Sequence, residues 1–569
     1  MNDVSIKARL NIGIEPKMYI IAAFLGVILL FYNINKIKPV VVDIDSFGLA
    51  SYLTVSYWVG YILMILCSII LYLDKKTKKD SIYLVYLIVM GLFLFGVPIF
   101  AEENARFAYS YYPTGDVKTV LDTQKIDKIS EYPLTSYRSW PGTHLISIFT
   151  IYYANISLDD LIKYMPIFWV FALILIMYGI GKLLKLPNNQ CFAISLFMMS
   201  SFWTAGYYYG PQSMAYILYL LFFVSIILLN RRDMTPANIV FIILVFTATV
   251  VTHMLTSIEL MTVFLFSSGF ILSSLEPILP VTIKDTIESS VNFLYKNRSR
   301  LIILFAVIFI GWHIYIARSM FGTGVRDLMR QITEGQIFNV FGTEKYNSGT
   351  TLIRQVIHYS RIMYPAIFAI AIITAAIFYI KGKIIENIDI VKICFLWLIG
   401  TFILLIFRYG AEMDDRVYIF SLLPAILIII MTFDRKIVTI LALLLIVLHI
   451  PAHYGTESYD MVRTTELKGS EFIALNIGPY DSINYYYGTL MKYYNPQLAL
   501  VNRQGLGYKK GIYDPDEESL NASTYIVDSI QMSNYLSYIY GIDKVQVWLQ
   551  KDNKLNLMYN NGDYSIYKK

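Results

Sequence analysis

Residues 81–100 read SIYLVYLIVMGLFLFGVPIF, an uninterrupted apolar run without a single charged side chain. A run of this length suits an α-helix that crosses about 30 Å of hydrocarbon, because each residue advances the helix by about 1.5 Å. Similar runs recur along most of the chain, and of its 569 residues 56% are hydrophobic and only 15% are charged. The sequence therefore predicts an α-helical polytopic membrane protein.

The apolar runs predict thirteen membrane-spanning helices, two of which meet at His253 with almost no loop between them. The predicted spans are residues 18–34, 50–73, 81–100, 164–184, 190–206, 211–229, 237–252, 255–274, 301–319, 363–380, 390–407, 417–433 and 437–452.

The net charge of +6 gives an orientation, because the basic residues gather in alternate short loops such as KKTKK at 75–79. Cytoplasmic loops of membrane proteins are enriched in Lys and Arg, so we expect the N-terminus in the cytoplasm and the chain in the cell membrane. The same clustering argues against a nucleic-acid partner. The three cysteines lie in apolar runs, which leaves neither a disulfide framework nor a spaced metal site.

Three regions follow from these patterns. Residues 1–80 form additional N-terminal spans, residues 81–452 form a transmembrane core with a long outer loop at 101–163, and residues 453–569 form a small extracytoplasmic α/β domain. In this last region STYIVDS (523–529) and KVQVWLQ (544–550) alternate like strands, whereas TELKGSEFIALNI (465–477) has a helical pattern.

The long outer loop carries the first candidate residue, Asp116, in the stretch AYSYYPTGDVKTVLD. A carboxylate held above the rim of the bilayer can accept a proton from an incoming hydroxyl group. The alternative is a turn aspartate that bonds its own backbone after Pro-Thr-Gly. Further along the loop, the apolar stretch after Pro141 predicts a helix along the membrane interface, and His144 within it is a candidate for substrate binding.

The turn RYGAEMDDR at 408–416 places Arg408 and Arg416 around three carboxylates, of which Asp414 is one. A guanidinium group suits a phosphate, because its planar fork donates two parallel hydrogen bonds. Ordinary salt bridges within a surface turn are the alternative.

Further candidates for substrate binding lie in other outer segments. His253 is able to position a sugar hydroxyl or a phosphate, or else simply caps a helix. Tyr208 and Gln212 in YYYGPQS offer an aromatic face and an amide, which also suit an interfacial belt. Arg361 ends the loop 320–362.

From residue 81 onward, the order of these parts resembles the GT-C membrane glycosyltransferases, which include oligosaccharyltransferase catalytic subunits and protein mannosyltransferases. The resemblance rests on the span before the Asp116 loop, on the segment from YRSWPGTHLISIFTIYY into the next span, and on YYYGPQSMAYILYLLFF, THMLTSIELMTVFLF and DRVYIFSLLPAIL. The tail that begins ELKGSEFIALNI resembles the soluble domain of the family.

The resemblance implies transfer of a sugar from a polyprenyl-phosphate-linked donor to a glycan, lipid or protein acceptor, with inversion at the anomeric carbon. Asp116 would act as the base and Arg416 would bind the phosphate. Gly115 and Val117 stand beside Asp116 where the family often has paired acids, so a divalent metal is possible but has no motif to support it. The chain also lacks the Trp-Trp-Asp sequence of oligosaccharyltransferases, which argues against transfer to asparagine. A lipid-linked glycan polymerase and a flippase or transporter remain alternatives.

Overall fold

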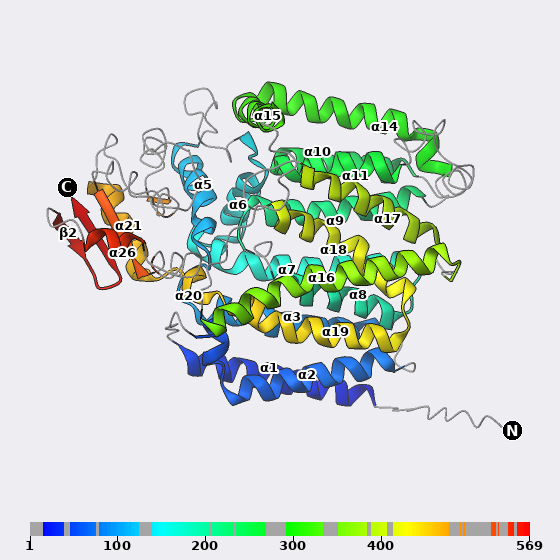
Figure 1. The fold of residues 1–569 in the computed structure, drawn as a ribbon, viewed down its shortest axis with the longest axis horizontal. Helices are drawn as coiled ribbons and strands as arrows, with labels where there is room; N and C mark the ends of the chain where they lie inside the picture. The colour runs from blue at the N-terminus through cyan, green and yellow to red at the C-terminus, as the bar shows by residue number, and fades with distance from the viewer. Residues whose placement is uncertain are drawn as a thin grey trace.

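Long α-helices lie side by side and make up most of the protein, with a small sheet at one end (Figure 1). The structure is a computed structural model, and it describes residues 15–38, 46–74, 79–124, 139–203, 208–230, 235–268, 292–333, 351–383, 388–406, 413–476, 490, 493–494, 525–530, 533, 544–550 and 555–568.

Each of the thirteen predicted spans coincides with a helix, although several helices begin earlier than the apolar pattern indicated. The helices are α1 (Pro16–Ile37), α2 (Val55–Leu73), α3 (Asp80–Gly91) continued by η2 (Leu92–Gly96) and α4 (Val97–Ala101), α7 (Leu158–Leu183), α8 (Asn188–Ser201), α9 (Pro211–Asn230), α10 (Pro236–Thr252), α11 (Met254–Ser267), α14 (Asn292–Gly311) continued by η6 (Trp312–Ile316), α16 (Leu352–Ile380), α17 (Ile388–Ile403) continued by η8 (Leu404–Ile406), α18 (Met413–Thr432), and α19 (Arg435–His449) continued by η10 (Ile450–Tyr454).

Among the described residues, nine helical segments are long and apolar enough to cross a membrane by length and composition. The protein is therefore an α-helical polytopic membrane protein, as the sequence predicted. The other four predicted spans fall on shorter helices, namely α8, α10, α11 and α17. The α8 and α11 helices have 14 residues each, which reach about 21 Å and not the full hydrocarbon thickness. Whether these four shorter helices each cross the membrane completely stays a prediction.

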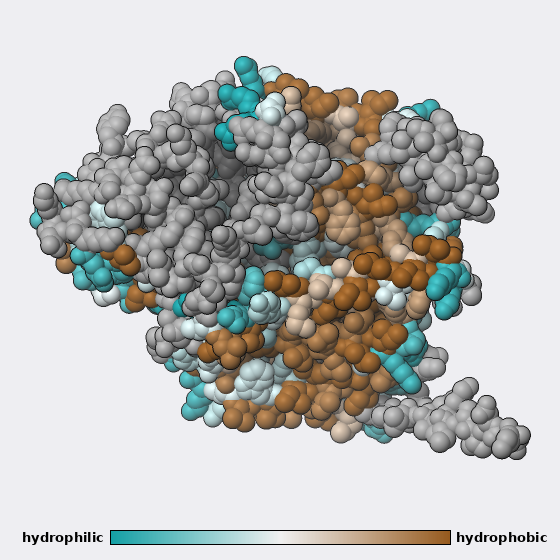
Figure 2. All heavy atoms as spheres, viewed as in Figure 1, coloured by the Kyte–Doolittle hydropathy of each residue, from teal (hydrophilic) through white to brown (hydrophobic). Residues whose placement is uncertain are grey.

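The spans divide into central and peripheral helices. Most residues of α18, of α9 and of the α3–α4 span are buried in the protein, whereas α1, α14 and α16 expose most of theirs. The exposed side chains on the peripheral helices are apolar, for example Phe24 on α1, Ile303 on α14 and Ile370 on α16. Figure 2 shows a broad apolar band along the face of the bundle in view. A surface of this kind is stable when it faces lipid.

Two prolines inside these spans remove a backbone donor, and buried side chains bond to the carbonyl groups that are released. Pro424 in α18 has no N–H for the carbonyl oxygen of Phe420, which instead accepts a hydrogen bond of 2.6 Å from the hydroxyl of Tyr219. Pro98 in α4 likewise releases the carbonyl oxygen of Leu94, which lies 3.3 Å from Nε2 of His449. These contacts satisfy backbone groups that no water reaches in a membrane.

The two ends of the bundle differ in chemistry. Short helices gather at one end, which we call the polar end: α5 (Tyr111–Thr123), α6 (Gly142–Ala154) and α20 (Glu457–Asp460) (Figure 1). The opposite end carries the short basic connections, including Lys182, which forms an exposed ion pair of 3.2 Å with Asp80. This separation agrees with the predicted alternation of loops, whereas the side that faces the cytoplasm stays a prediction.

The small C-terminal domain holds a three-stranded antiparallel sheet in the order β1-β3-β2, formed by β1 (Tyr525–Ser529), β2 (Asn556–Asn560) and β3 (Tyr564–Lys568). Helix α21 (Thr464–Asn476) packs on β3, where a Cβ atom on Gly469 would come within 2.2 Å of the Tyr564 ring. The strand predicted in STYIVDS and the helix predicted in TELKGSEFIALNI are both confirmed. The strand predicted in KVQVWLQ is wrong, because Lys544–Leu549 forms helix α26 with Val545 and Trp548 buried one turn apart.

Candidate functional site

Helix α6 lies at the polar end with its polar face turned inward and its apolar face turned outward. Thr143, His144 and Ser147 are buried. The opposite face exposes large apolar side chains: Leu145, Ile146, Phe149, Tyr152 and Tyr153. A helix of this kind suits a place where lipid lies on one side and a polar interior on the other. The predicted helix after Pro141 is confirmed, and His144 lies on its inner face.

The start of α6 is held against two neighbouring helices. A Cβ atom on Gly142 would lie 2.2 Å from Oγ1 of Thr252, so only glycine allows α6 to approach the end of α10 this closely. The indole of Trp140 donates to Nε2 of His313 at 3.4 Å, and the indole of Trp312 donates to the carbonyl oxygen of Ser139 at 3.1 Å. These contacts fix the inner face of α6 beside the junction of α10 and α11.

His253 occupies that junction and caps the start of α11. Its Nδ1 accepts from the backbone N–H of Thr256 at 3.3 Å and lies 2.9 Å from the Thr256 hydroxyl. Burial, and secondly the positive charge of nearby Arg416, lower the pKa of His253 to about 3. The imidazole is therefore neutral at pH 7 and carries its proton on Nε2, which makes that nitrogen a donor. Two residues singled out by the sequence, His253 and Arg416, lie close together.

Asp116 lies within helix α5 and is completely buried. The alternative of a turn aspartate is wrong, because residues 111–123 are helical and the preceding Thr114 bonds back to the carbonyl oxygen of Tyr111 at 2.6 Å. Helix α5 packs against α6, so the Asp116 helix and the inner face of α6 are neighbours.

Tyr208 and Gln212 flank the start of α9 beside α6. The Tyr208 ring packs edge to face on Phe107 with 5.7 Å between centroids, and Gln212 is buried as the second residue of the helix. The next tyrosine, Tyr209, joins its hydroxyl to that of Ser147 on α6 at 2.5 Å. The aromatic turn therefore lies beside the buried polar side chains of α6, and we call the turn and these side chains together the polar layer.

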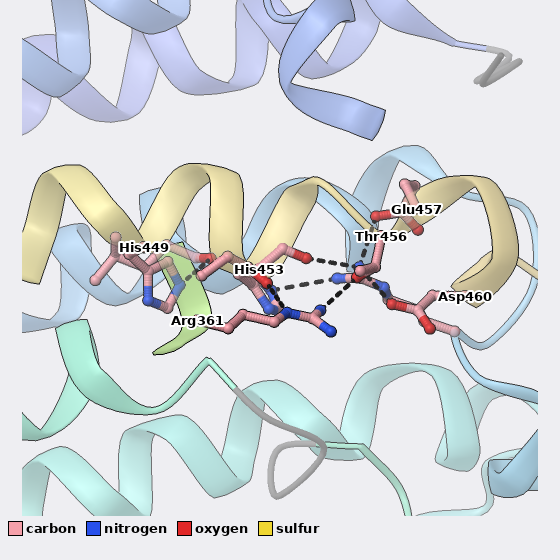
Figure 3. Close-up of polar contacts among 9 residues, drawn as sticks. Arg361, His449, His453, Thr456, Glu457 and Asp460 are labelled. Atoms are coloured by element: carbon pink, nitrogen blue, oxygen red, sulfur yellow. Dashed lines mark hydrogen bonds and ion pairs between the residues drawn. The ribbon is translucent and has the colours of Figure 1, made fainter. Parts of the chain in front are cut away.

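Arg361 belongs to helix α16, which begins at Leu352, and so it does not lie in the loop that the sequence predicted. Its Nε donates to the carbonyl oxygen of Ala452 at 2.9 Å, and its terminal nitrogen donates to the Thr456 hydroxyl at 2.9 Å. The guanidinium also lies 4.9 Å from the centroid of Trp203. Figure 3 shows Arg361 directed toward Thr456 and the end of the last span.

A second group of charges, the Arg106 cluster, consists of Arg106, Glu102, Glu457, Asp460 and His453. A terminal nitrogen of Arg106 lies 2.9 Å from Glu457 and 3.3 Å from Asp460, and it donates to the carbonyl oxygen of His453 at 2.9 Å. All five residues are less than about one tenth exposed. Figure 3 labels His453, Glu457 and Asp460 of this cluster, at and after the end of the last span.

Glu102 and Glu457 form a carboxyl pair within this cluster. Burial, the charge of Glu457 and a hydrogen bond to Glu457 raise the pKa of Glu102 well above its usual range, and Arg106 opposes the shift. Burial also raises the pKa values of Glu457 and Asp460, although Arg106 lowers both. These buried carboxyl groups therefore hold their protons to a higher pH than exposed ones do.

Aromatic residues beside the end of α8 and the start of α9 pack on Arg361 and on Phe107, the neighbour of Arg106. Trp203 stacks on Arg361, while Tyr208 packs on Phe107, whose ring lies 5.1 Å from the Arg106 guanidinium. Phe107 has a φ of +68°, a left-handed value that side chains rarely adopt. This strained residue joins the Arg106 cluster to the start of α9.

Two spans end in π-helical turns at the polar end, η6 and η10, and a third π-helical turn, η2, precedes α4 in its span. Such turns often occur at functional sites, because an extra residue in a turn redirects side chains. Here η10 carries His453 and η6 carries His313, both of which face the groups described above. The irregular helix ends therefore coincide with the buried charges.

For two candidates, Arg408 and Asp414, no side chain is among the described parts of the structure. Arg408 lies outside the described residues, and for Asp414 only the main chain is described, in the first turn of α18. No three His, Cys, Asp or Glu side chains converge as metal ligands within the described part of the chain.

The Arg106 cluster was missed in the sequence, although a signal was present. Glu102 and Arg106 follow the span 81–100 directly, and HYGTESYD at 453–460 follows the last span directly. Charges at the ends of spans usually pair with one another, and both stretches belong to the same predicted side.

The chain matches no protein-family model and no curated protein at significant similarity. Among solved structures it is similar to the crystal structure of the Archaeoglobus fulgidus oligosaccharyltransferase in complex with Zn and sulfate. That match has a TM-score of 0.47 and 12% sequence identity, and it covers 85% of this chain and 73% of the other.

Proposed function

We propose that this protein is a membrane glycosyltransferase that moves a sugar from a polyprenyl-phosphate-linked donor to an acceptor at the polar end, which we assign to the extracytoplasmic face. The observation that carries the proposal is the polar layer beneath α6. There helix α5 with the buried Asp116, the neutral His253 and Arg416 lie behind α6. The outer face of α6 is apolar. A donor with its tail in lipid and its phosphate at the rim would meet both surfaces at once.

The reaction would be a single displacement. The acceptor oxygen attacks the anomeric carbon, the bond from that carbon to the phosphate oxygen breaks, and the electron pair leaves with the phosphate. The acceptor proton passes to the Asp116 carboxylate as general base. One displacement inverts the anomeric carbon.

Arg416 would bind the donor phosphate and stabilise the charge that grows on it as the bond breaks. His253 suits a role beside it, because a neutral imidazole does not compete with Arg416 for the anion and its Nε2 can donate to a sugar or phosphate oxygen. Tyr208, Gln212 and His144 would line the sugar side of the site. Arg361 is engaged by Ala452 and Thr456, so we assign it to holding the last span in place.

The acceptor is a glycan, lipid or protein in this proposal, and protein or surface glycan glycosylation is the context that fits the cell surface. The chain would divide into N-terminal spans (1–80), the catalytic membrane core (81–452) and the C-terminal domain (453–569).

Purified protein in lipid nanodiscs tests the proposal when it is given a synthetic polyprenyl-phosphate sugar with a labelled sugar moiety. We expect release of labelled sugar to an acceptor only with active protein and only with the lipid-linked donor. Movement of intact donor between leaflets of proteoliposomes without cleavage would identify a flippase. Extension of one lipid-linked glycan by another would identify a polymerase.

A further inference from the structure

Helix α15 (Arg318–Thr333) follows η6 at the polar end and runs across the direction of α14 (Figure 1). Phe321 attaches the helix to the bundle, because its ring packs on Phe309 at 6.3 Å and on His313 at 5.3 Å between centroids. Since α14 is one of the membrane-spanning segments, α15 lies roughly parallel to the plane of the bilayer, at its rim.

The sequence of α15 is strongly amphipathic. Among its described side chains, the apolar Phe321, Val325 and Met329 recur every four residues along one face. Val325 is 42% exposed and Met329 is 55% exposed, so the described protein leaves about half of each of these side chains uncovered. The opposite face carries Arg326 and Arg330, both exposed.

The exposed apolar face continues a surface that already faces lipid. Ile303, Val307, Ile310 and Ile314 form an exposed apolar stripe that leads along α14 and η6 to the base of α15. Apolar side chains directed into the acyl boundary, with arginines four residues apart on the other face, match the pattern of a helix that lies in a membrane interface. Arginine side chains on such a face bind the phosphate groups of anionic headgroups.

We propose that α15 is an interfacial helix that binds the bilayer itself, with Val325 and Met329 in the acyl boundary and Arg326 and Arg330 on anionic lipid headgroups. Together with the apolar face of α6, it would anchor both sides of the polar layer at the same membrane depth. Trp140 and Trp312, which join the α6 start to η6, connect the two helices. The inference does not depend on which reaction the protein performs.

Spin labels on single cysteines test this placement in the full-length protein. The native Cys67 is replaced by Ala, and labels are placed by Val325→Cys, Met329→Cys and Arg326→Cys in separate proteins. In proteoliposomes of phosphatidylcholine and phosphatidylglycerol we expect labels at 325 and 329 to relax with oxygen, which concentrates in the hydrocarbon. The label at 326 should relax with a water-soluble nickel complex. The matched reference is Ile303→Cys, on the lipid-facing side of α14.

A second measurement tests the headgroup contact. Arg326→Gln with Arg330→Gln should make the label at 329 more accessible to nickel, about threefold or more, in vesicles that contain phosphatidylglycerol. In vesicles of phosphatidylcholine alone the same pair should change accessibility little. Labels at 325 and 329 that relax with nickel as fully as the label at 326, or that are shielded from both reagents, would overturn the interfacial placement. An equal effect of the arginine pair in both kinds of vesicle would overturn the anionic-headgroup contact.

Discussion

Replacing Arg106 by Gln should destabilise the protein strongly, because Arg106 is only 8% exposed and supplies the charge that Glu457 and Asp460 face at 2.9 Å and 3.3 Å. Removal of one partner from a buried ion pair typically costs about 3–5 kcal/mol, since the remaining charge stays buried without compensation. By contrast, Lys182→Gln breaks an ion pair whose side chains are 44% and 48% exposed. Such surface pairs contribute about 1 kcal/mol or less, which makes Lys182→Gln the matched control.

The assay is thermal unfolding in detergent, followed with a maleimide dye that becomes fluorescent on reaction with the buried thiols of Cys191 and Cys394. We expect the melting temperature of Arg106→Gln to fall by on the order of 5 °C, and that of Lys182→Gln to stay within about 1 °C. Adding Glu457→Gln to Arg106→Gln should recover part of the loss, because it removes the uncompensated carboxylate. Equal melting temperatures for the two single variants, or a further loss in the double variant, would refute the reasoning.

Three further predictions concern the buried carboxyl groups, the binding of the donor phosphate and the orientation of the chain. Stability should fall as the pH rises from about 4.5 through the raised folded pKa of Glu102, because the folded state binds the Glu102 proton more tightly than the unfolded state does. Glu102→Gln should flatten this dependence in melting curves between pH 5 and 8, and an unchanged slope would count against the raised pKa of Glu102. Arg416→Ala should reduce kcat/KM for a polyprenyl-phosphate donor by about 10- to 100-fold with a normal yield of folded protein, and Arg416→Lys should recover only part of that activity. Activity lost in proportion to the yield of folded protein would favour a structural salt bridge. A cysteine placed by Leu475→Cys should react with an impermeant thiol reagent from outside intact cells, whereas one placed by Lys79→Cys should react only after the cells are opened. The reverse labelling would contradict the predicted orientation of the chain in the membrane.

The apolar runs predicted the helices well, because the need to bury about 30 Å of backbone in lipid leaves a strong pattern in a single sequence. The start of α16 was missed because residues 352–362 mix charged and apolar side chains, although Arg354 and Ile357 are buried and the helix is continuous. The strand prediction for KVQVWLQ was wrong for a different reason. Val545 and Val547 alternate as in a strand, but Val545 and Trp548 are the residues that the domain buries, and they share a helix face.

The candidate site was predicted only in part, because a sequence shows which residues lie at span ends but not which ends meet. His253 and Arg416 were both singled out, and their proximity depends on how α10, α11 and α18 pack. The contact of Arg106 with His453 joins residues 347 positions apart, which no local pattern reveals. The burial of Asp116 likewise depends on packing around α5, which the turn chemistry of Pro-Thr-Gly obscured.

The central claim is that Asp116 accepts the acceptor's proton during sugar transfer, and turnover of Asp116→Asn with saturating polyprenyl-phosphate donor tests it most directly. Asparagine keeps the size and hydrogen bonding of the side chain but removes its basicity. Loss of a general base typically lowers the rate by about 10²–10⁴-fold, and we expect a loss of this size with an unchanged melting temperature. Turnover near that of the unmodified protein would contradict the account, because Asp116 would then serve only to hold helix α5 in place.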